Sequence, residues 1–319
     1  MGIEAPVVSD NPDRILVIKL GALGDVIQAL GPMRAIREHH PDAHITCMTT
    51  APYLDLIEQT GFFDTVWEHK RPSNIDLMGW ITQRLKFKAR KFRRVYDLQT
   101  SSRSNRLYKL LWPGPYPEWS GNASGCSHLH ANPARDSMHT LERQAEQLAD
   151  AGIPATPPPS LEGLGEDISD LNVPSPYCLV VPGGAAHRPE KRWPTDHYRD
   201  AIQRIIATGV TPVIVGTRSE GSLAREITDG IDGVINLVDQ TSLLSLIGLA
   251  KGARFALGND SGPMHVTAVA GVPSVVLYSH ASDPALCAQR GASVTILRKS
   301  SLNEITVDEV MAALPPRNP

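Results

Sequence analysis

The segment Gly258–Pro273 constrains the fold more than any other part of this chain. It lies between two apolar runs, Arg254–Leu257 and Ser274–Tyr278, so it predicts a strand, a polar turn, a helix opened by Pro263 and a second strand. Proline suits the first turn of a helix because its missing N–H would have no partner there. Free amides and the positive end of the helix dipole predict an anion site, typically for phosphate, at the carboxyl edge of a parallel sheet. A polar cap on an ordinary turn remains the alternative.

Length and composition favour a two-domain enzyme of a reducing compartment. A chain of 319 residues exceeds what one hydrophobic core normally organises. The net charge of −3 gives no reason to expect nucleic acid as a partner. Residues 1–13 lack a basic, apolar leader, and the chain shows no long apolar stretch, so we expect a cytoplasmic protein. Its four cysteines are scattered, which argues against a zinc site or a disulfide framework: Cys47, Cys126, Cys178 and Cys287.

Strands and helices alternate twice along the chain. The prolines of Ala155–Ser160 predict a linker between the two series, because three consecutive prolines fit neither a helix interior nor a sheet. We therefore predict α/β architecture with two Rossmann-like domains, 1–160 and 161–319, whose parallel sheets face a central ligand cleft. Residues 112–138 are expected to form a long surface loop. Strands are expected near 14–19, 44–48, 94–99, 178–181, 213–215, 234–237, 254–257, 274–278 and 294–297.

The turn Leu20–Asp25 follows the first predicted strand. It lacks a full G-x-G-x-x-G, and the second strand ends in Cys47–Ala51 without an acid for a ribose, so a dinucleotide site is disfavoured. A carboxylate on such a turn can deprotonate a sugar hydroxyl. Asp25 is therefore a candidate base, although capping the following helix would use the same residue.

The second half contains further candidates at its predicted sheet edge. Gly183 and Gly184 let a backbone approach a ligand closely, and Lys191 can supply charge to a diphosphate or stay a solvated loop cation. Glu220 follows the next strand, where a ribose-binding acid and an ordinary helix start are both compatible with the pattern. No D-x-D motif or metal-ligand cluster is present in the sequence, so no metal is expected.

The segment Arg84–Arg94 holds seven basic residues in eleven positions. It lies within Gly79–Arg94, along which Ile81, Leu85, Ala89 and Phe92 recur at helical spacing, so this longer segment predicts a basic amphipathic helix. Such a helix can lie on an anionic membrane, and a solvated helix packed on its own domain is the alternative. With Arg103 and Arg106 nearby, this half of the chain favours an anionic acceptor.

Four motifs follow one another along the chain: Lys19–Ile27, Asp97–Gln99 with Arg103–Ser104, Lys191–Pro194, and Asp260–His265. Together they resemble the heptosyltransferase-type glycosyltransferases of glycosyltransferase family 9. The resemblance spans nearly the whole chain, and the last motif is the most specific. Ala186 and His187 stand where the family usually has hydroxyl residues, and His280 is a further departure, to which we assign no role.

The resemblance implies a GT-B fold with the acceptor domain first and the nucleotide-sugar domain second. It implies inverting, metal-independent transfer from ADP-heptose to an anionic glycolipid, the lipopolysaccharide inner core, at the inner face of the cytoplasmic membrane and without a cofactor. Asp25 takes the place of the base, and His265 lies near the leaving group. Donor-binding residues would be Gly183, Gly184, Lys191, Glu220, Asp260, Ser261, Gly262, Pro263 and Met264; acceptor-binding residues would be Gly24, Arg103 and Ser104.

Two other functions fit the same motifs. A nucleotide-sugar 2-epimerase shares this architecture and acts without an acceptor. A non-catalytic module that binds a sugar nucleotide or a glycolipid is the other alternative, favoured by the altered phosphate loop at Ala186 and His187.

Overall fold

The computed structural model describes residues 13–73, 75–184 and 188–316. The chain forms two compact units. The amino-terminal unit contains residues up to 21, 31–135 and 143–157, and the carboxyl-terminal unit contains 22–30, 136–142 and the residues from 158 onward. The last division falls within the predicted linker Ala155–Ser160, whereas residues 22–30, predicted with the first domain, group with the carboxyl-terminal unit.

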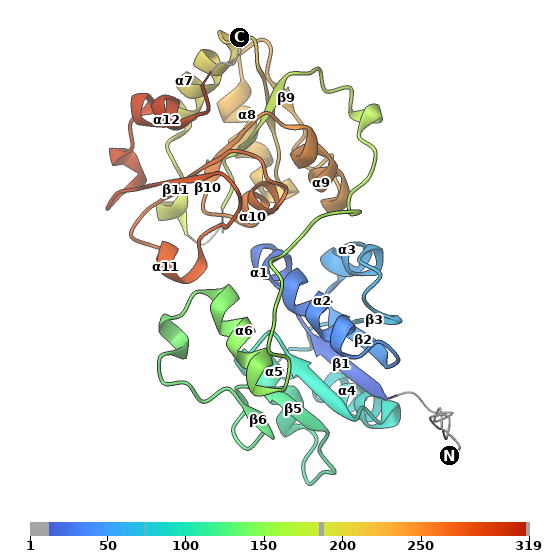
Figure 1. Ribbon diagram of the computed structural model, residues 1–319. Helices are drawn as coiled ribbons and strands as arrows, with labels where there is room; N and C mark the ends of the chain where they lie inside the picture. The colour runs from blue at the N-terminus through green and yellow to red at the C-terminus, as the bar shows by residue number, and fades with distance from the viewer. Residues whose placement is uncertain (1–12, 74, 185–187, 317–319) are drawn as a thin grey trace, which may run out of the picture. The chain divides into compact units, whose positions relative to one another are not determined.

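The amino-terminal unit is built on a six-stranded parallel sheet in the order β3-β2-β1-β4-β5-β6 (Figure 1). Its central strands are apolar on both sides, as expected for strands covered by helices on two faces. Its strands are β1 (Arg14–Ile18), β2 (His44–Thr49), β3 (Thr65–Glu68), β4 (Arg94–Asp97), β5 (Glu118–Gly121) and β6 (His128–Leu129). Its helices include α2 (Leu30–His39), α3 (Leu54–Gln59), α4 (Leu77–Arg90), α5 (Ser102–Lys109) and most of α6 (Thr140–Asp150).

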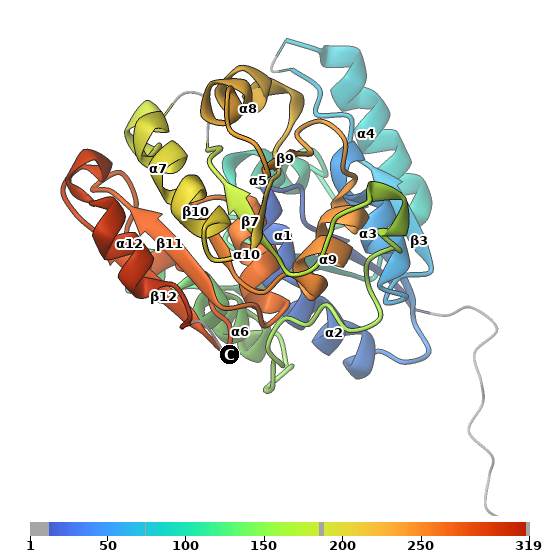
Figure 2. The same cartoon turned by 90° about the horizontal axis from the view of Figure 1, so that it is seen from above.

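The carboxyl-terminal unit repeats this design, with a parallel sheet in the order β12-β11-β10-β7-β8-β9. Helices lie on both faces of this sheet (Figure 2). Its strands are β7 (Tyr177–Val181), β8 (Thr211–Ile214), β9 (Ile235–Asn236), β10 (Ala256–Asn259), β11 (Ser274–Tyr278) and β12 (Val294–Arg298). Its helices are α1 (Leu23–Gln28), α7 (Thr195–Ile206), α8 (Gly221–Thr228), α9 (Leu243–Gly252), α10 (Gly262–Val269), α11 (Pro284–Cys287) and α12 (Val307–Ala313).

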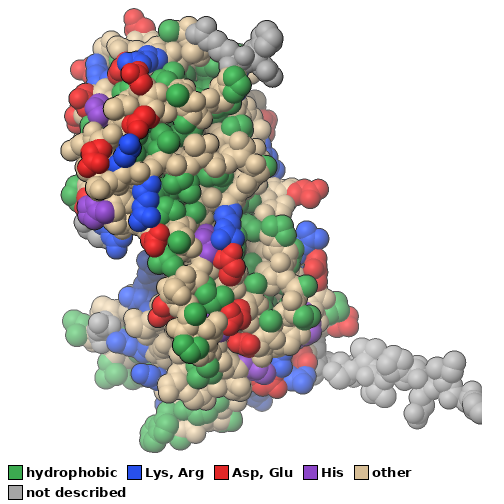
Figure 3. Space-filling model, turned by 60° about the vertical axis from the view of Figure 1, so that its left-hand side comes forward, with side chains coloured by type: hydrophobic (Ala, Val, Ile, Leu, Met, Phe, Trp, Pro, Cys, Tyr) green, Lys and Arg blue, Asp and Glu red, His purple; other side chains and the backbone are tan. Residues whose placement is uncertain are grey.

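Both sheets have the strand order of a Rossmann fold, in which the order of the parallel strands reverses beside the first strand. The predicted α/β class with two parallel sheets is therefore confirmed. Helix α7 shows why the second core forms: Tyr198, Ala201, Ile202 and Ile205 lie on one helical face and are fully buried. Basic and acidic side chains are interspersed on the face seen in Figure 3, in keeping with the small net charge.

The predicted surface loop 112–138 is wrong in part, because it contains β5 and β6. These strands are short and rich in small or polar residues, so their sequence lacks the apolar run of a central strand. Pairing with β4 makes β5 a strand, and β6 pairs in turn with β5. Strand β3, which the sequence pattern did not predict, is likewise short and pairs with β2.

The basic helix also differs from its prediction. Helix α4 ends at Arg90, and Lys91 follows in the left-handed region with φ of 50°. Phe92 leaves the helix and is buried, whereas Ile81 and Leu85 are exposed. The apolar residues that the periodicity placed on one face therefore do not share an environment.

Candidate active site

The turn between β10 and α10 has the predicted geometry. Ser261 is the N-cap residue of α10 in an extended conformation, and proline stands in the first turn. The Ser261 side chain makes no cap hydrogen bond, and its Oγ is buried without a partner among the described residues. The helix amides are thus not closed off by their own cap, which leaves this end of α10 available to an anion.

Asp260, directly before this helix, is the acceptor of three side-chain hydrogen bonds. Lys191 Nζ lies 2.7 Å and Ser282 Oγ 2.6 Å from Asp260 Oδ2. Gln289 Nε2 lies 3.1 Å from Oδ1. Burial alone would raise the pKa of Asp260, but the hydrogen bonds from Lys191 and Ser282 and the lysine charge outweigh burial and lower it. Asp260 is therefore ionised at neutral pH.

Lys191 ends a single 3-10 turn, η4 (Pro189–Lys191), and pairs with Asp260. The two side chains are 14% and 9% exposed, so this is a largely buried ion pair. An ammonium group has three donors, and one bond to Asp260 leaves capacity for an incoming anion. The structure thus brings together two of the predicted donor-binding residues, which are far apart in the sequence.

A residue that the sequence analysis missed, Asn259, holds this arrangement together. It is fully buried at the end of β10. Its Nδ2 donates to the Pro182 carbonyl at 2.7 Å, and its Oδ1 accepts from the Trp193 amide at 3.1 Å and from Tyr198 Oη at 3.0 Å. These bonds tie the chain before Gly183 and the chain after Lys191 to the strand that carries Asp260. A polar residue at the end of an apolar strand was the available signal.

Glu220 makes the helix-start contacts, one of the two interpretations that its sequence left open. Its Oε2 accepts from the Thr217 amide at 2.7 Å and from Thr217 Oγ1 at 3.0 Å, which completes the cap of η5 (Arg218–Glu220). Its Oε1 lies so close to Gly183 that a Cβ there would clash with it. At Gly216 a Cβ would lie 2.8 Å from Oε2. Both glycines therefore make room for a carboxylate at the carboxyl edge of β7 and β8.

The backbone of Gly184 lies near the residues that follow Lys191. An added Cβ would lie 3.7 Å from the Lys191 carbonyl oxygen, and the Gly184 carbonyl accepts from Arg192 Nη2 at 3.5 Å. The departures Ala186 and His187 lie outside the described residues.

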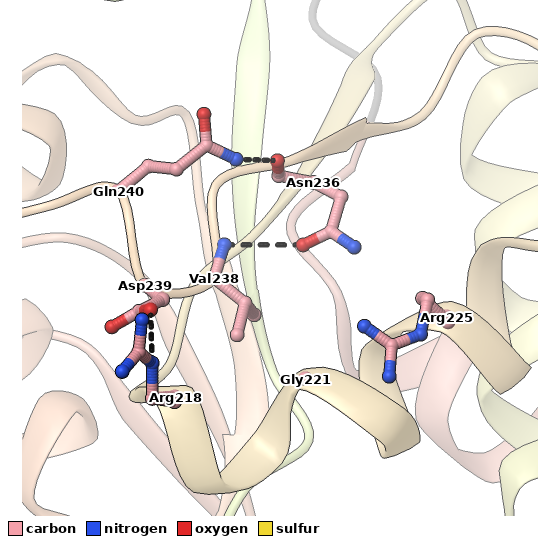
Figure 4. A pocket seen from close by; sticks show the side chains of 7 residues that line it. All are labelled: Arg218, Gly221, Arg225, Asn236, Val238, Asp239 and Gln240. Atoms are coloured by element: carbon pink, nitrogen blue, oxygen red, sulfur yellow. Dashed lines mark hydrogen bonds and ion pairs between the residues drawn. The ribbon is translucent and has the colours of Figure 1, made fainter.

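A pocket of about 430 Å³ is lined in part by Arg218 and Gly221, from the chain segment that also contains Glu220 (Figure 4). Arg218 pairs with Asp239 at 3.0 Å, and Asn236 Oδ1 accepts from the Val238 amide at 3.1 Å. The lining of the pocket offers cations, amides and one apolar wall, which suits a flat polar molecule. The sequence analysis did not find it, because it is made by residues that follow two different strands. The lining residues are Arg218, Gly221, Arg225, Asn236, Val238, Asp239 and Gln240.

Asp25 lies in the first turn of α1, within the same unit as His265. Its Oδ2 accepts from the Ala22 amide at 3.1 Å, so it caps the helix as the alternative interpretation required. It is only partly buried, so its carboxylate is not enclosed by this cap. The negative charges of Asp260 and Asp25 both act to raise the pKa of His265, so both carboxylates lie within electrostatic reach of its ring.

The His265 ring lies directly on Gly24. A Cβ at Gly24 would lie 2.5 Å from Cδ2 of His265 and 2.8 Å from its Nε2. One turn earlier, a Cβ at Gly262 would lie 2.7 Å from Cβ of Leu23. Two glycines thus allow α1 and α10 to pack closely. Gly24, which is buried, acts by being small rather than through a side-chain contact with an acceptor.

Burial lowers the pKa of His265 to about 4, and the nearby charges of Asp260 and Asp25 only partly oppose this effect. The imidazole is therefore neutral at pH 7 and has one N–H to donate. It can stabilise a developing negative charge by a hydrogen bond, not as a cation.

The other two predicted acceptor residues belong to the amino-terminal unit. Ser104 is fully buried, and its hydroxyl bonds with Ser101 in the capping box of α5, so its role is structural. Arg103 is half-buried, and its Nη1 donates to the Pro72 carbonyl at 3.2 Å. The prediction that Ser104 contacts an acceptor directly is not supported by its position.

Two further properties concern the part of the chain that the structure describes. None of its helices has the length and apolar character needed to cross a membrane. Within the same residues, no three His, Cys, Asp or Glu side chains are grouped so that they could hold a metal ion.

The two Rossmann-like units and the open α10 turn define a protein of the GT-B glycosyltransferase class. Residues 82–311 match the family described as glycosyltransferase family 9 (heptosyltransferase). The chain belongs to this family, as the sequence motifs indicated.

Relatives agree with this assignment. Lipopolysaccharide heptosyltransferase 1 of Escherichia coli K12 is 21% identical over 326 residues, covering 92% of this chain and 96% of that protein. The solved structure of a family 9 glycosyl transferase from Veillonella parvula has a TM-score of 0.80 at 20% identity and covers 95% and 96% of the two chains. E. coli heptosyltransferase WaaC with ADP has a TM-score of 0.74 at 20% identity, covering 94% and 98%. The match to the heptosyltransferases 2 spans only 30% of their length.

We predict that Gly24→Ala destabilises the protein by about 1–3 kcal/mol, because the new methyl group overlaps the His265 ring and α1 must move away from α10. Urea unfolding measures the loss. Gly221→Ala is the matched control, since a Cβ there meets only an ordinary contact at 3.7 Å. Equal stability of the two variants would show that α1 and α10 are not tightly packed.

We predict that His265 makes stability depend on pH. Because its folded pKa is lowered from 6.5 to about 4, its contribution is complete above 6.5 and is lost as the pH falls toward 4. The loss is on the order of 3 kcal/mol. Urea unfolding of His265→Gln should show a shallower pH dependence than the wild type in this window. Parallel curves for the two proteins would contradict the buried, neutral imidazole.

Proposed function

We propose that this protein transfers a heptose, or a related sugar, from an ADP-sugar to a lipopolysaccharide core acceptor, with inversion at the anomeric carbon and without a metal ion. The observation that carries the proposal is the ion pair of Asp260 and Lys191 beside the open end of α10. This arrangement can bind a diphosphate, and it lies in the same unit as a carboxylate, Asp25, that can accept a proton.

The donor would bind along the carboxyl edge of the second sheet. Its diphosphate would meet the α10 amides, with Lys191 as the nearest cation. The Glu220 carboxylate would accept from the ribose hydroxyls, and the pocket lined in part by Arg218 and Gly221 would hold the base. The relative crystallised with ADP supports this choice of nucleotide. The residues proposed to line the donor are Gly183, Gly184, Lys191, Glu220, Asp260, Ser261, Gly262, Pro263 and Met264.

The proposed reaction is a single displacement. Asp25 takes the proton of the acceptor hydroxyl while its oxygen forms a bond to the anomeric carbon, and the bond from that carbon to the diphosphate breaks. Negative charge then develops on the leaving diphosphate. Lys191, the α10 dipole and the N–H of neutral His265 would stabilise that charge. Since Asp25 also caps α1, its carboxylate is held in place before the acceptor arrives.

The proposed acceptor is an anionic glycolipid at the inner face of the cytoplasmic membrane, approached by Arg103 and the segment Arg84–Arg94. The basic residues of this segment differ in whether they bond within their own unit. Arg84, Arg90 and Arg94 engage the Trp112 carbonyl, the Trp67 ring and Glu118 within their own unit. Lys86 and Lys91 are exposed and would meet a membrane surface; Lys88 and Arg93 are also exposed but bond with the Gly114 carbonyl and Asp13.

We predict that Asp25→Asn keeps the affinity for ADP and lowers turnover by about 10²-fold or more, because the amide cannot accept the acceptor proton. Calorimetric titration and a transfer assay measure the two quantities. Asp55→Asn, which changes another aspartate in a first helical turn, an exposed one, is the matched control. Equal loss of binding and turnover in Asp25→Asn would remove it as the base.

We predict that Lys191→Ala weakens ADP binding by about tenfold or more, because the diphosphate loses its cation and Asp260 becomes an unpaired buried charge. Lys299→Ala breaks an exposed pair with Glu309 and should leave ADP binding unchanged. An unchanged dissociation constant for Lys191→Ala would place the diphosphate elsewhere.

Titration with ADP, UDP and GDP tests the choice of nucleotide, and incubation with the donor alone tests the type of reaction. We expect preferential binding of ADP and no isomerised donor without acceptor. An epimerised sugar would favour the 2-epimerase, and the absence of single-turnover transfer would favour a binding module.

A further inference from the structure

Exposed apolar side chains gather along the amino-terminal part of α4 and beside it. In a folded domain such side chains are normally scattered singly. Here five occur within eleven residues, and Trp112 joins them from the loop after α5. We name this set the α4 ridge: Ile75 is 92% exposed, Leu77 71%, Met78 70%, Ile81 41%, Leu85 62% and Trp112 72%.

The α4 ridge is a second apolar face of a helix that already has a buried one. Trp80 and Phe87 face the core of the amino-terminal unit. Leu77, Ile81 and Leu85 recur every four residues and form a separate stripe. Folding is satisfied by the buried face, so the stripe is not explained by the stability of this unit.

Trp112 is held against this helix by its backbone. Arg84 Nη2 donates to the Trp112 carbonyl at 2.9 Å, and Lys88 Nζ donates to the Gly114 carbonyl at 3.3 Å. The indole side chain remains exposed. The loop therefore runs along α4 and presents a tryptophan beside the leucines, a residue type suited to the boundary between water and hydrocarbon.

The charges along the α4 ridge are mostly positive, and the exception is Asp76, the exposed N-cap residue of α4 between Ile75 and Leu77. The helix carries Arg84, Lys86, Lys88 and Arg90 and no Asp or Glu. At its carboxyl end a groove of about 460 Å³ has an apolar floor that includes Phe87, Phe92 and Leu111, and its cations are Lys88, Lys91 and Arg93. Hydrophobic and basic side chains lie side by side on this unit in Figure 3.

We infer that the α4 ridge docks on the surface of an anionic lipid bilayer, with its apolar side chains in the interfacial layer and the lysines of α4 at the lipid phosphates. The inference names the surface on which the proposed transferase meets a lipid-bound acceptor, and in that respect it rests on the proposed function. Apolar area and basic charge both favour this partner. A second copy would fit poorly, because a two-fold contact would bring the α4 cations against one another.

The test is flotation of the full chain with vesicles of phosphatidylcholine, with and without phosphatidylglycerol. The wild type should bind the anionic vesicles and be released by salt. The double variant Leu77→Ser/Leu85→Ser should partition at least about tenfold less, because it removes two interfacial side chains. Leu129→Ser changes a leucine of similar kind on β6, 43% exposed, and should bind as the wild type does.

Undiminished vesicle binding by the double variant would overturn the inference. So would a concentration-dependent dimer of the wild type that the double variant abolishes, because a second copy would then cover the α4 ridge. Transfer to a deacylated, water-soluble acceptor keeps this result separate from the proposed function. The double variant should retain that activity, whereas a failure of the wild type to use any acceptor would count against the function and not against the docking surface.

Discussion

The ion pair between Asp260 and Lys191 is the interaction on which the site depends. Two charges this deeply buried are costly unless each keeps good partners. The structure supplies them through Ser282 and Gln289, which also bond the Asp260 carboxylate, and through Asn259, which fixes the neighbouring backbone. The pair is balanced before any ligand binds. The proposed diphosphate would therefore need only the helix amides and the remaining lysine donors, and the protein would not have to rearrange buried charge to accept it.

Close packing of α1 on α10 has a consequence for the chemistry. The helix that carries Asp25 belongs to the same compact unit as Lys191, Asp260 and His265. The proposed base and the proposed diphosphate site are thus fixed relative to one another by local contacts, chiefly the His265 ring on Gly24. Burial that makes His265 neutral also removes a competing cation from beside Asp25. A base in this position keeps its carboxylate available for a proton, because it is not locked in an ion pair with the histidine.

The α10 turn could be predicted from the sequence because its determinants are local: an apolar strand, a proline in the first turn and the residues between them. The pairing of Lys191 with Asp260 could not, since it spans 69 residues and arises only when β7 and β10 lie side by side. Strand β5 was missed for a related reason, because its four residues become a strand through pairing with β4. The role of Ser104 was misjudged because hydroxyl residues suit ligand contacts and helix caps equally well, and only burial separates the two.

Helix α4 shows why helical spacing alone does not tell which apolar residues of a helix face the core. Its apolar residues recur at helical spacing in two registers, one containing Trp80 and Phe87 and the other Leu77, Ile81 and Leu85. Only one register can face the core, and the wide aromatic rings occupy it because they fill the space above the sheet beside Trp119. The other register stays in contact with water at a cost in solubility. The proposed anionic bilayer would cover this apolar stripe and attract the cations beside it, so that it would meet both the hydrophobic and the electrostatic character of the helix.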